Sequence, residues 1–203
     1  MTLFPLFVLA FILLGAPGIG QSTPVAAQTY EAPAPMAVEV KEHIKVPYFS
    51  QFTDITSPKW QKVGCGITSL GMIIEYYKPG TVSVDTLLED GIAQGAYSDA
   101  GWTYKGLIGV SSAYGFTGES HDLAGRADAF AQFKEAVERG PVIASVYYKF
   151  EPGNPIPHLV VITSIEGDTV YYNDPAGKED GTLSVDDFSK AWKKRYIEIY
   201  PVS

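Results

Sequence analysis

The chain has 203 residues, a formal net charge of −8 and a hydrophobic fraction of 46%. This composition is typical of a globular protein rather than a disordered or fibrous one, and the residues after about the first 40 suffice for one domain with a sizeable core. All 15 lysines and arginines lie at or after Lys41, without a dense basic run. That distribution argues against nucleic acid or an anionic membrane surface as a main partner.

The chain opens with an apolar run from Leu3 to Leu14. The run is shorter than the roughly 20 residues of a membrane-spanning helix, and it fits the hydrophobic region of a secretory signal. Small residues precede Gln28, so we expect residues 1–27 to be a signal peptide. No Lys or Arg precedes the run, and the alternative is an uncleaved anchor. Both interpretations predict an extracytoplasmic protein, secreted or held in the cell envelope.

Residues 28–43 are rich in Ala, Pro and Glu and lack periodicity, which predicts a linker. Residues 44–203 form the expected domain, for which we expect no stable membrane insertion. Apolar periodicity, capping residues and closing glycines predict helices over 67–77, 83–92, 103–115, 128–140 and 184–192. Strands are predicted over 44–50, 141–149, 158–166, 169–174 and 196–201. Helices first and an antiparallel sheet afterwards predict an α+β fold.

Cys65 is the single cysteine of the chain, in the first turn of the helix that continues through 67–77. A helix N-terminus favours the thiolate, which is the nucleophilic form of cysteine. Gly64 and Gly66 would leave the sulfur unshielded and let a substrate approach the backbone. The alternative is a small buried hydrophobic residue, the common fate of a lone cysteine. A lone thiol in an exported protein favours chemistry over packing.

A catalytic thiol needs a base, and the chain has three histidines. His43 lies beside the linker and His121 in an expected loop, so neither is favoured. His158 opens the strand HLVVITSI after a loop rich in Pro and Gly, a position from which a rigidly held side chain can face a cleft. His158 is therefore the candidate base.

Asp174 is the candidate acceptor that would orient His158. If the turn between the two strands centres on Gly167, both side chains lie on one face and within reach of each other. A two-residue turn at Gly167 and Asp168 would slip the register by one residue and separate them. An alternative for Asp174 is a purely structural turn, since Asn, Asp and Pro are turn residues.

Gln51 ends the segment VPYFSQ, 14 residues before Cys65. Its side-chain amide could join the backbone N–H of Cys65 in stabilising a developing oxyanion. The alternative is an ordinary surface glutamine.

Four segments, VPYFSQ, GCGITSLGMIIEYY, PHLVVITSI and VYYNDP, together resemble the C39-like cysteine peptidases over residues 44–201. This family is papain-like and related to the peptidase domain of bacteriocin-processing transporters. The resemblance implies a papain-like fold with N-terminal helices packed on an antiparallel sheet. It also implies Cys65 as nucleophile, His158 as base, Asp174 as orienter and Gln51 as oxyanion donor.

The sequence departs from the family at Pro157, where a glycine often precedes the histidine. The transporter relatives carry membrane spans and an ATPase, for which this chain shows no segment. Their double-glycine leader substrates are therefore not implied.

We therefore expect an exported thiol peptidase acting on peptide or isopeptide bonds of a peptide or protein substrate. The alternatives are an acyltransferase or amidase using the same site, and a non-catalytic papain-like binding module. No cofactor is expected. Cys65, His158 and Asp174 could in principle hold zinc, but no close pair of ligands supports a metal site.

Overall fold

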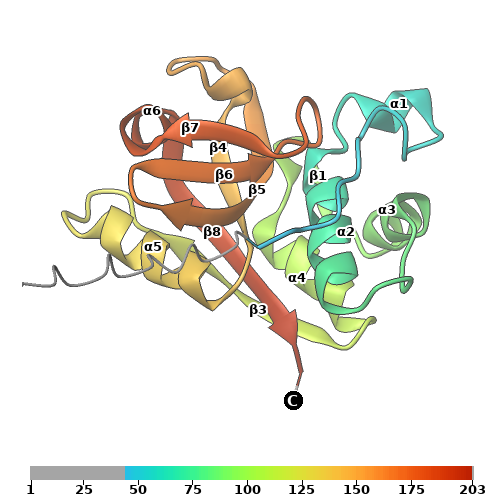
Figure 1. Ribbon diagram of the computed structural model, residues 1–203. Coiled ribbons are helices and arrows are strands. Elements are labelled where there is room, and N and C mark those ends of the chain that lie inside the picture. The colour runs from blue at the N-terminus through green and yellow to red at the C-terminus, as the bar shows by residue number, and fades with distance from the viewer. Residues whose placement is uncertain (1–43, 203) are drawn as a thin grey trace, which may run out of the picture. The chain divides into compact units, whose positions relative to one another are not determined.

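The computed structural model describes residues 44–202 (Figure 1). The expected signal peptide and linker, as well as His43, lie outside the described residues. The helices are α1 (Pro58–Gln61), α2 (Cys65–Tyr77), α3 (Val84–Ala93), α4 (Tyr104–Ser112), α5 (Ala129–Arg139), α6 (Val185–Ala191) and the 3₁₀ turn η1 (Tyr148–Phe150). The strands are β1 (Tyr97–Ser98), β2 (Gly101–Trp102), β3 (Phe116–Asp122), β4 (Val142–Tyr147), β5 (Pro157–Glu166), β6 (Thr169–Asn173), β7 (Gly181–Ser184) and β8 (Trp192–Pro201).

Six of these strands form one antiparallel sheet in the order β3-β8-β4-β5-β6-β7, and β1 pairs with β2 in a separate hairpin. The strand β8, last in the sequence, lies between β3 and β4 (Figure 1). Helices and an antiparallel sheet of this kind confirm the predicted α+β class.

The sheet is covered by helices on both faces. Along β5, Leu159 and Val161 belong to the core shared with α2, α3 and α4, whereas Val160 and Ile162 belong to the core shared with α5 and α6. Successive side chains of a strand point to opposite faces, so an unbroken apolar run in β5 serves two cores at once. This central position makes β5 a rigid support for His158 near its start.

The helix boundaries follow from local signals. The side chains of Ser83 and Thr103 accept hydrogen bonds from the N–H groups of Thr86 and Gly106, and α3 and α4 begin directly after these caps. Ser184 caps α6 in the same way. Each cap satisfies a donor that the first helical turn leaves unpaired.

Two predictions about the strands are wrong. Residues 44–50 form no strand, because this irregular segment is bound by a side chain: Asn173 Nδ2 donates to Val46 O at 3.0 Å. The strand β3, which contains His121, replaces an expected loop. It is an edge strand with Phe116 as its one fully buried side chain, so it shows no apolar alternation.

Within residues 44–202, no helix has the length and apolar character needed to cross a membrane.

Candidate active site

Cys65 is the first residue of α2, as the sequence predicts, and its side chain is half-buried. The preceding residue, Gly64, provides no side-chain cap, so the first-turn N–H groups are not engaged by a capping side chain. The partial positive charge of the helix N-terminus therefore acts on the sulfur.

The two glycines beside Cys65 have a packing role rather than the expected one. A Cβ at Gly64 would lie 2.3 Å from Ile55 Cδ1, and a Cβ at Gly66 would lie 2.7 Å from atoms of Trp102. Protein side chains therefore fill the space that the sequence suggested for substrate. These contacts fix the start of α2 against α1 and the β1–β2 hairpin.

His158 and Asp174 form a short, buried hydrogen bond. His158 Nε2 lies 2.6 Å from Asp174 Oδ1, and the His158 side chain is 3% exposed. Since Nε2 is engaged by the carboxylate, Nδ1 is the ring nitrogen left for the Cys65 thiol, which lines the same cleft.

The pKa of His158 reflects these neighbours. Burial alone would lower it, but the hydrogen bond to Asp174 and the neighbouring Cys65 side chain raise this pKa from 6.5 to about 9. The protonated imidazole is therefore the stable form near neutral pH.

The register of the β5–β6 hairpin explains how His158 meets Asp174. Glu166 pairs with Thr169 across a two-residue turn at Gly167 and Asp168, and such a turn alone would place the two side chains on opposite faces. The register then shifts between Ile162 and Ser164, so that Val161 pairs with Asn173. One extra residue in β5 restores the favourable register.

The loop after β6 holds the Asp174 carboxylate in place. The backbone N–H of Ala176 donates to Asp174 Oδ1 at 2.8 Å, and the backbone N–H of Asp174 donates to Lys178 O at 2.7 Å. The neighbouring Asn173 instead donates to Val46 O and accepts a hydrogen bond from the N–H of Asp180. Asn173 thus fixes the loop, and Asp174 contacts the imidazole.

Gln51 is buried rather than on the surface. Its backbone N–H donates to Pro175 O at 2.9 Å, next to Asp174, and its side-chain Nε2 donates to Gln61 O at 2.7 Å. Gln51, Cys65 and His158 line the same cleft. The four predicted site residues are thus brought together, while their catalytic roles stay predictions.

Comparison with known proteins gives the family. The sequence model of the Peptidase_C39 like family matches residues 43–201. The chain belongs to this family. It is therefore a cysteine peptidase by family, and the resemblance found in its sequence is confirmed. No curated protein matches the chain.

Solved structures show the same papain-like fold. A double glycine motif protease from an AMS/PCAT transporter, in complex with the leader peptide, is 22% identical and covers 80% of this chain and 96% of its own, with a TM-score of 0.56. A C39-like peptidase from Bacillus anthracis is 20% identical over 79% of this chain and 98% of that one, with a TM-score of 0.59. The peptidase domain of Streptococcus ComA is 19% identical over 70% and 93%, with a TM-score of 0.53.

In this C39-like peptidase the cleft has a volume of about 930 Å³. Trp102 and Tyr104 line the cleft, whereas Trp60 packs against Tyr97 and Trp102. Other lining residues had no signal in the sequence, since they come from β4, β8 and the segment before β5: Ser145, Tyr148, Ile156, Lys193 and Arg195.

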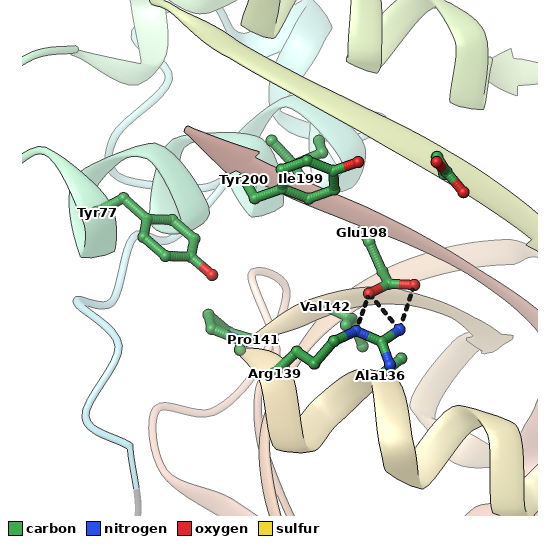
Figure 2. Close-up of a pocket in the computed structure, with 10 residues that line it drawn as sticks. Tyr77, Ala136, Arg139, Pro141, Val142, Glu198, Ile199 and Tyr200 are labelled. Carbon is green, nitrogen blue, oxygen red and sulfur yellow. Dashed lines mark hydrogen bonds and ion pairs between the residues drawn. The ribbon is translucent and has the colours of Figure 1, made fainter. Parts of the chain in front are cut away.

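A second cavity of about 360 Å³ shares no lining residue with the cleft and has neither cysteine nor histidine in its wall. Figure 2 shows its ion pair, in which Arg139 Nη2 lies 2.7 Å from Glu198 Oε2. His121, the rejected candidate base, stacks on Tyr196 and lies 3.1 Å from Glu198. His121 is thus engaged in structural contacts away from the thiol.

No group of three or more His, Cys, Asp or Glu side chains that could hold a metal ion occurs among residues 44–202.

Proposed function

We propose that this protein hydrolyses peptide or isopeptide bonds through Cys65, with His158 as acid and base and Asp174 as the orienting group. The observation that supports this most is the buried 2.6 Å hydrogen bond between His158 and Asp174, with His158 in the same cleft as Cys65 at the N-terminus of α2. The cleft of about 930 Å³ is large enough for a ligand of several residues, and one structural relative was solved with a leader peptide bound.

The first step is attack of the Cys65 thiolate on the substrate carbonyl carbon, which moves negative charge to the carbonyl oxygen. The donors for that oxygen are the backbone N–H of Cys65 and one Nε2 hydrogen of Gln51. The other Nε2 hydrogen of Gln51 is already bonded to Gln61 O. The His158 imidazolium gives its proton to the leaving amine, and a thioester remains on Cys65.

The second step releases the acyl group. Neutral His158 takes a proton from water, the resulting hydroxide attacks the thioester, and the thiolate leaves with its charge restored. Asp174 keeps the imidazole oriented throughout, since its carboxylate also accepts the N–H of Ala176.

The test is cleavage of a mixed peptide library by the wild-type protein and by Cys65→Ala, His158→Ala and His121→Ala. We expect the first two variants to lose about 10⁴-fold or more in kcat/KM. His121→Ala is the matched control, because it removes a histidine outside the cleft, and it should retain cleavage.

Several outcomes would contradict the proposal. Equal cleavage by the wild type and Cys65→Ala would exclude Cys65 as nucleophile. Products in which the acyl group is joined to an added amine, rather than to water, would favour the acyltransferase alternative. A folded wild-type protein that cuts nothing and whose Cys65 reacts slowly with iodoacetamide at pH 6 would favour the binding module.

We also propose that the protein is exported, on the basis of the apolar run at residues 3–14 and the small residues before Gln28. Mass spectrometry of the native envelope or secreted protein should then find an N-terminus at or near Gln28. A cytoplasmic protein that begins at Met1 or Thr2 would contradict export.

A further inference from the structure

The cleft of this acidic chain carries more positive than negative side chains. Its lining includes Lys62, Lys193 and Arg195 against one carboxylate, Asp99, whereas the chain as a whole has a net charge of −8. His158 also lines the cleft, but it is paired with Asp174. A concave surface with an excess of one sign concentrates ligands of the opposite sign.

Two of these cations come from an irregularity in β8. Ser145 of β4 pairs with Arg195, but the next residue, Val146, pairs with Trp192. Residues 193–194 therefore have no partner in β4 and form a bulge. Bulges redirect side chains and are frequent next to active sites, and this one lies at the edge of the cleft.

The bulge is held by specific hydrogen bonds. The backbone N–H of Leu123 donates to Lys194 O at 2.8 Å, and Trp192 Nε1 donates to Arg195 O at 3.1 Å. Lys194 has a φ of 57°, a conformation that costs energy for a residue other than glycine. Such a strained and well-bonded bulge fixes the direction in which Lys193 and Arg195 leave the strand.

Lys193 has no counter-ion among residues 44–202. Its Nζ lies 4.8 Å from the centre of the Tyr147 ring, and none of the ion pairs of this part of the chain includes it. Burial and then the charge of Arg195 lower the pKa of Lys193. Arg195 binds Asp122 through Nε at 2.8 Å, so of these two neighbouring cations only Arg195 is paired with a carboxylate.

The pairing across β8, β4 and β5 gives the distance between Arg195 and the start of β5, where His158 lies. Arg195 pairs with Ser145, and Ser145 pairs with Leu159, which directly follows His158. Adjacent strands lie about 4.8 Å apart, so Arg195 is about 10 Å from Leu159 along the sheet. An extended peptide advances roughly 3.3 Å per residue, so this span equals about three residues of substrate.

We propose that Lys193 and Arg195 bind a carboxylate of the peptide substrate about three residues from the bond that is cut. This inference rests on the proposed peptidase function. The carboxylate belongs to an Asp or Glu side chain or to the C-terminus of the substrate, since both offer the same group to a Lys–Arg pair.

The experiment is a mixed decapeptide library, made once with free and once with amidated C-termini, in which products are sequenced by mass spectrometry. For the wild type we expect enrichment of Asp and Glu at one position within about four residues of the cut. Lys193→Met should reduce that enrichment about ten-fold, the usual effect of losing a hydrogen bond to a charged group. Lys193→Glu should favour Lys and Arg at the same position.

Lys194→Met is the matched control, because Lys194 belongs to the same bulge and does not line the cleft. It should keep the acidic preference. Enrichment of Asp and Glu in the amidated library would show that the bound carboxylate belongs to a side chain. Cuts enriched near the C-terminal end in the free library alone would show that it is the C-terminal carboxylate. A wild type without acidic preference in either library, or a preference that Lys193→Met and Lys194→Met leave equally strong, would overturn the inference.

A binding measurement separates this inference from the proposed function. Fluorescence anisotropy of Cys65→Ala with labelled peptide pools that contain Glu or Gln at the central position needs no cleavage. Tighter binding of the Glu pool, lost on adding Lys193→Met and weakened by salt, would support the inference even if the wild type cut nothing. Equal binding of the two pools would overturn it.

Discussion

At the scale of single residues, the side chain of Gln51 combines burial with an incomplete set of hydrogen bonds. Its Nε2 donates to Gln61 O at 2.7 Å, while its Oε1 is buried and has no partner among residues 44–202. An unpaired buried acceptor costs about 1–3 kcal/mol, and such costs are concentrated at functional sites. The hydrogen bond to Gln61 orients the amide and leaves one N–H for an oxyanion.

We expect Gln51→Ala to lower kcat by about 10²–10³-fold and to change KM much less, because the donor acts mainly in the transition state. The structure also predicts a modest stability effect, since the lost hydrogen bond to Gln61 is worth about 1 kcal/mol. The melting temperature should therefore fall by a few degrees.

The measurements are kcat, KM and melting temperature on a peptide from the library screen. Gln132→Ala is the matched control: Gln132 on α5 also uses its amide in one hydrogen bond, to Asp128 at 2.7 Å, outside the cleft. An unchanged kcat in well-folded Gln51→Ala would exclude Gln51 from the oxyanion site.

At the scale of elements, one extra residue in β5 determines the geometry of the site. The Gly167–Asp168 turn alone gives a register in which His158 and Asp174 would point to opposite faces. The register shifts between Ile162 and Ser164, where Thr163 has no partner in β6. Because of this shift, the part of β5 before Thr163, which includes His158, presents its side chains on the same face as Asp174. The contact between His158 and Asp174 therefore depends on a bulge five residues away from His158.

The bulge in β8 acts in the same way on the opposite side of β4. Arg195 pairs with Ser145 and Trp192 pairs with Val146. Residues 193–194 between them interrupt an otherwise regular ladder of β8 on β4. The two bulged strands, β5 and β8, flank β4, and residues of all three strands line the cleft. In this fold, irregular pairing is thus concentrated where side chains must be aimed.

At the scale of the whole molecule, protonation of His158 links the site to the stability of the fold. The pKa of His158 is about 9 in the folded protein and about 6.5 in an unfolded chain. Because the folded value is higher, the stabilisation from this group is fully present below about pH 6.5. It is lost as the pH rises from about 6.5 to 9.

We therefore expect the melting temperature to fall by several degrees between pH 6.5 and 9, beyond any change common to the rest of the protein. Asp174→Asn removes the carboxylate that helps to raise the pKa of His158, so its melting curve should depend less on pH in this window. Differential scanning calorimetry of both proteins from pH 6 to pH 10 provides the measurement. Identical pH dependence of the melting temperature in the two proteins would contradict a pKa of His158 that is raised by Asp174.

The sequence by itself determined the features that are encoded within a few neighbouring residues. The start of α2 at Cys65, the capped starts of α3 and α4 and the apolar run of β5 all follow from hydrogen bonds and side-chain periodicity inside one segment. The order of Gln51, Cys65, His158 and Asp174 along the chain was enough to identify the family.

Only the tertiary structure decided how these segments meet. The bulge at Thr163, the bulge at residues 193–194 and the edge strand β3 depend on pairing between strands that are far apart in the sequence. No local pattern fixes a strand register, since the energy that selects it comes from contacts with the neighbouring strand and the two cores. The same physical reason explains why the sequence named Cys65 and His158 but not Lys193 and Arg195.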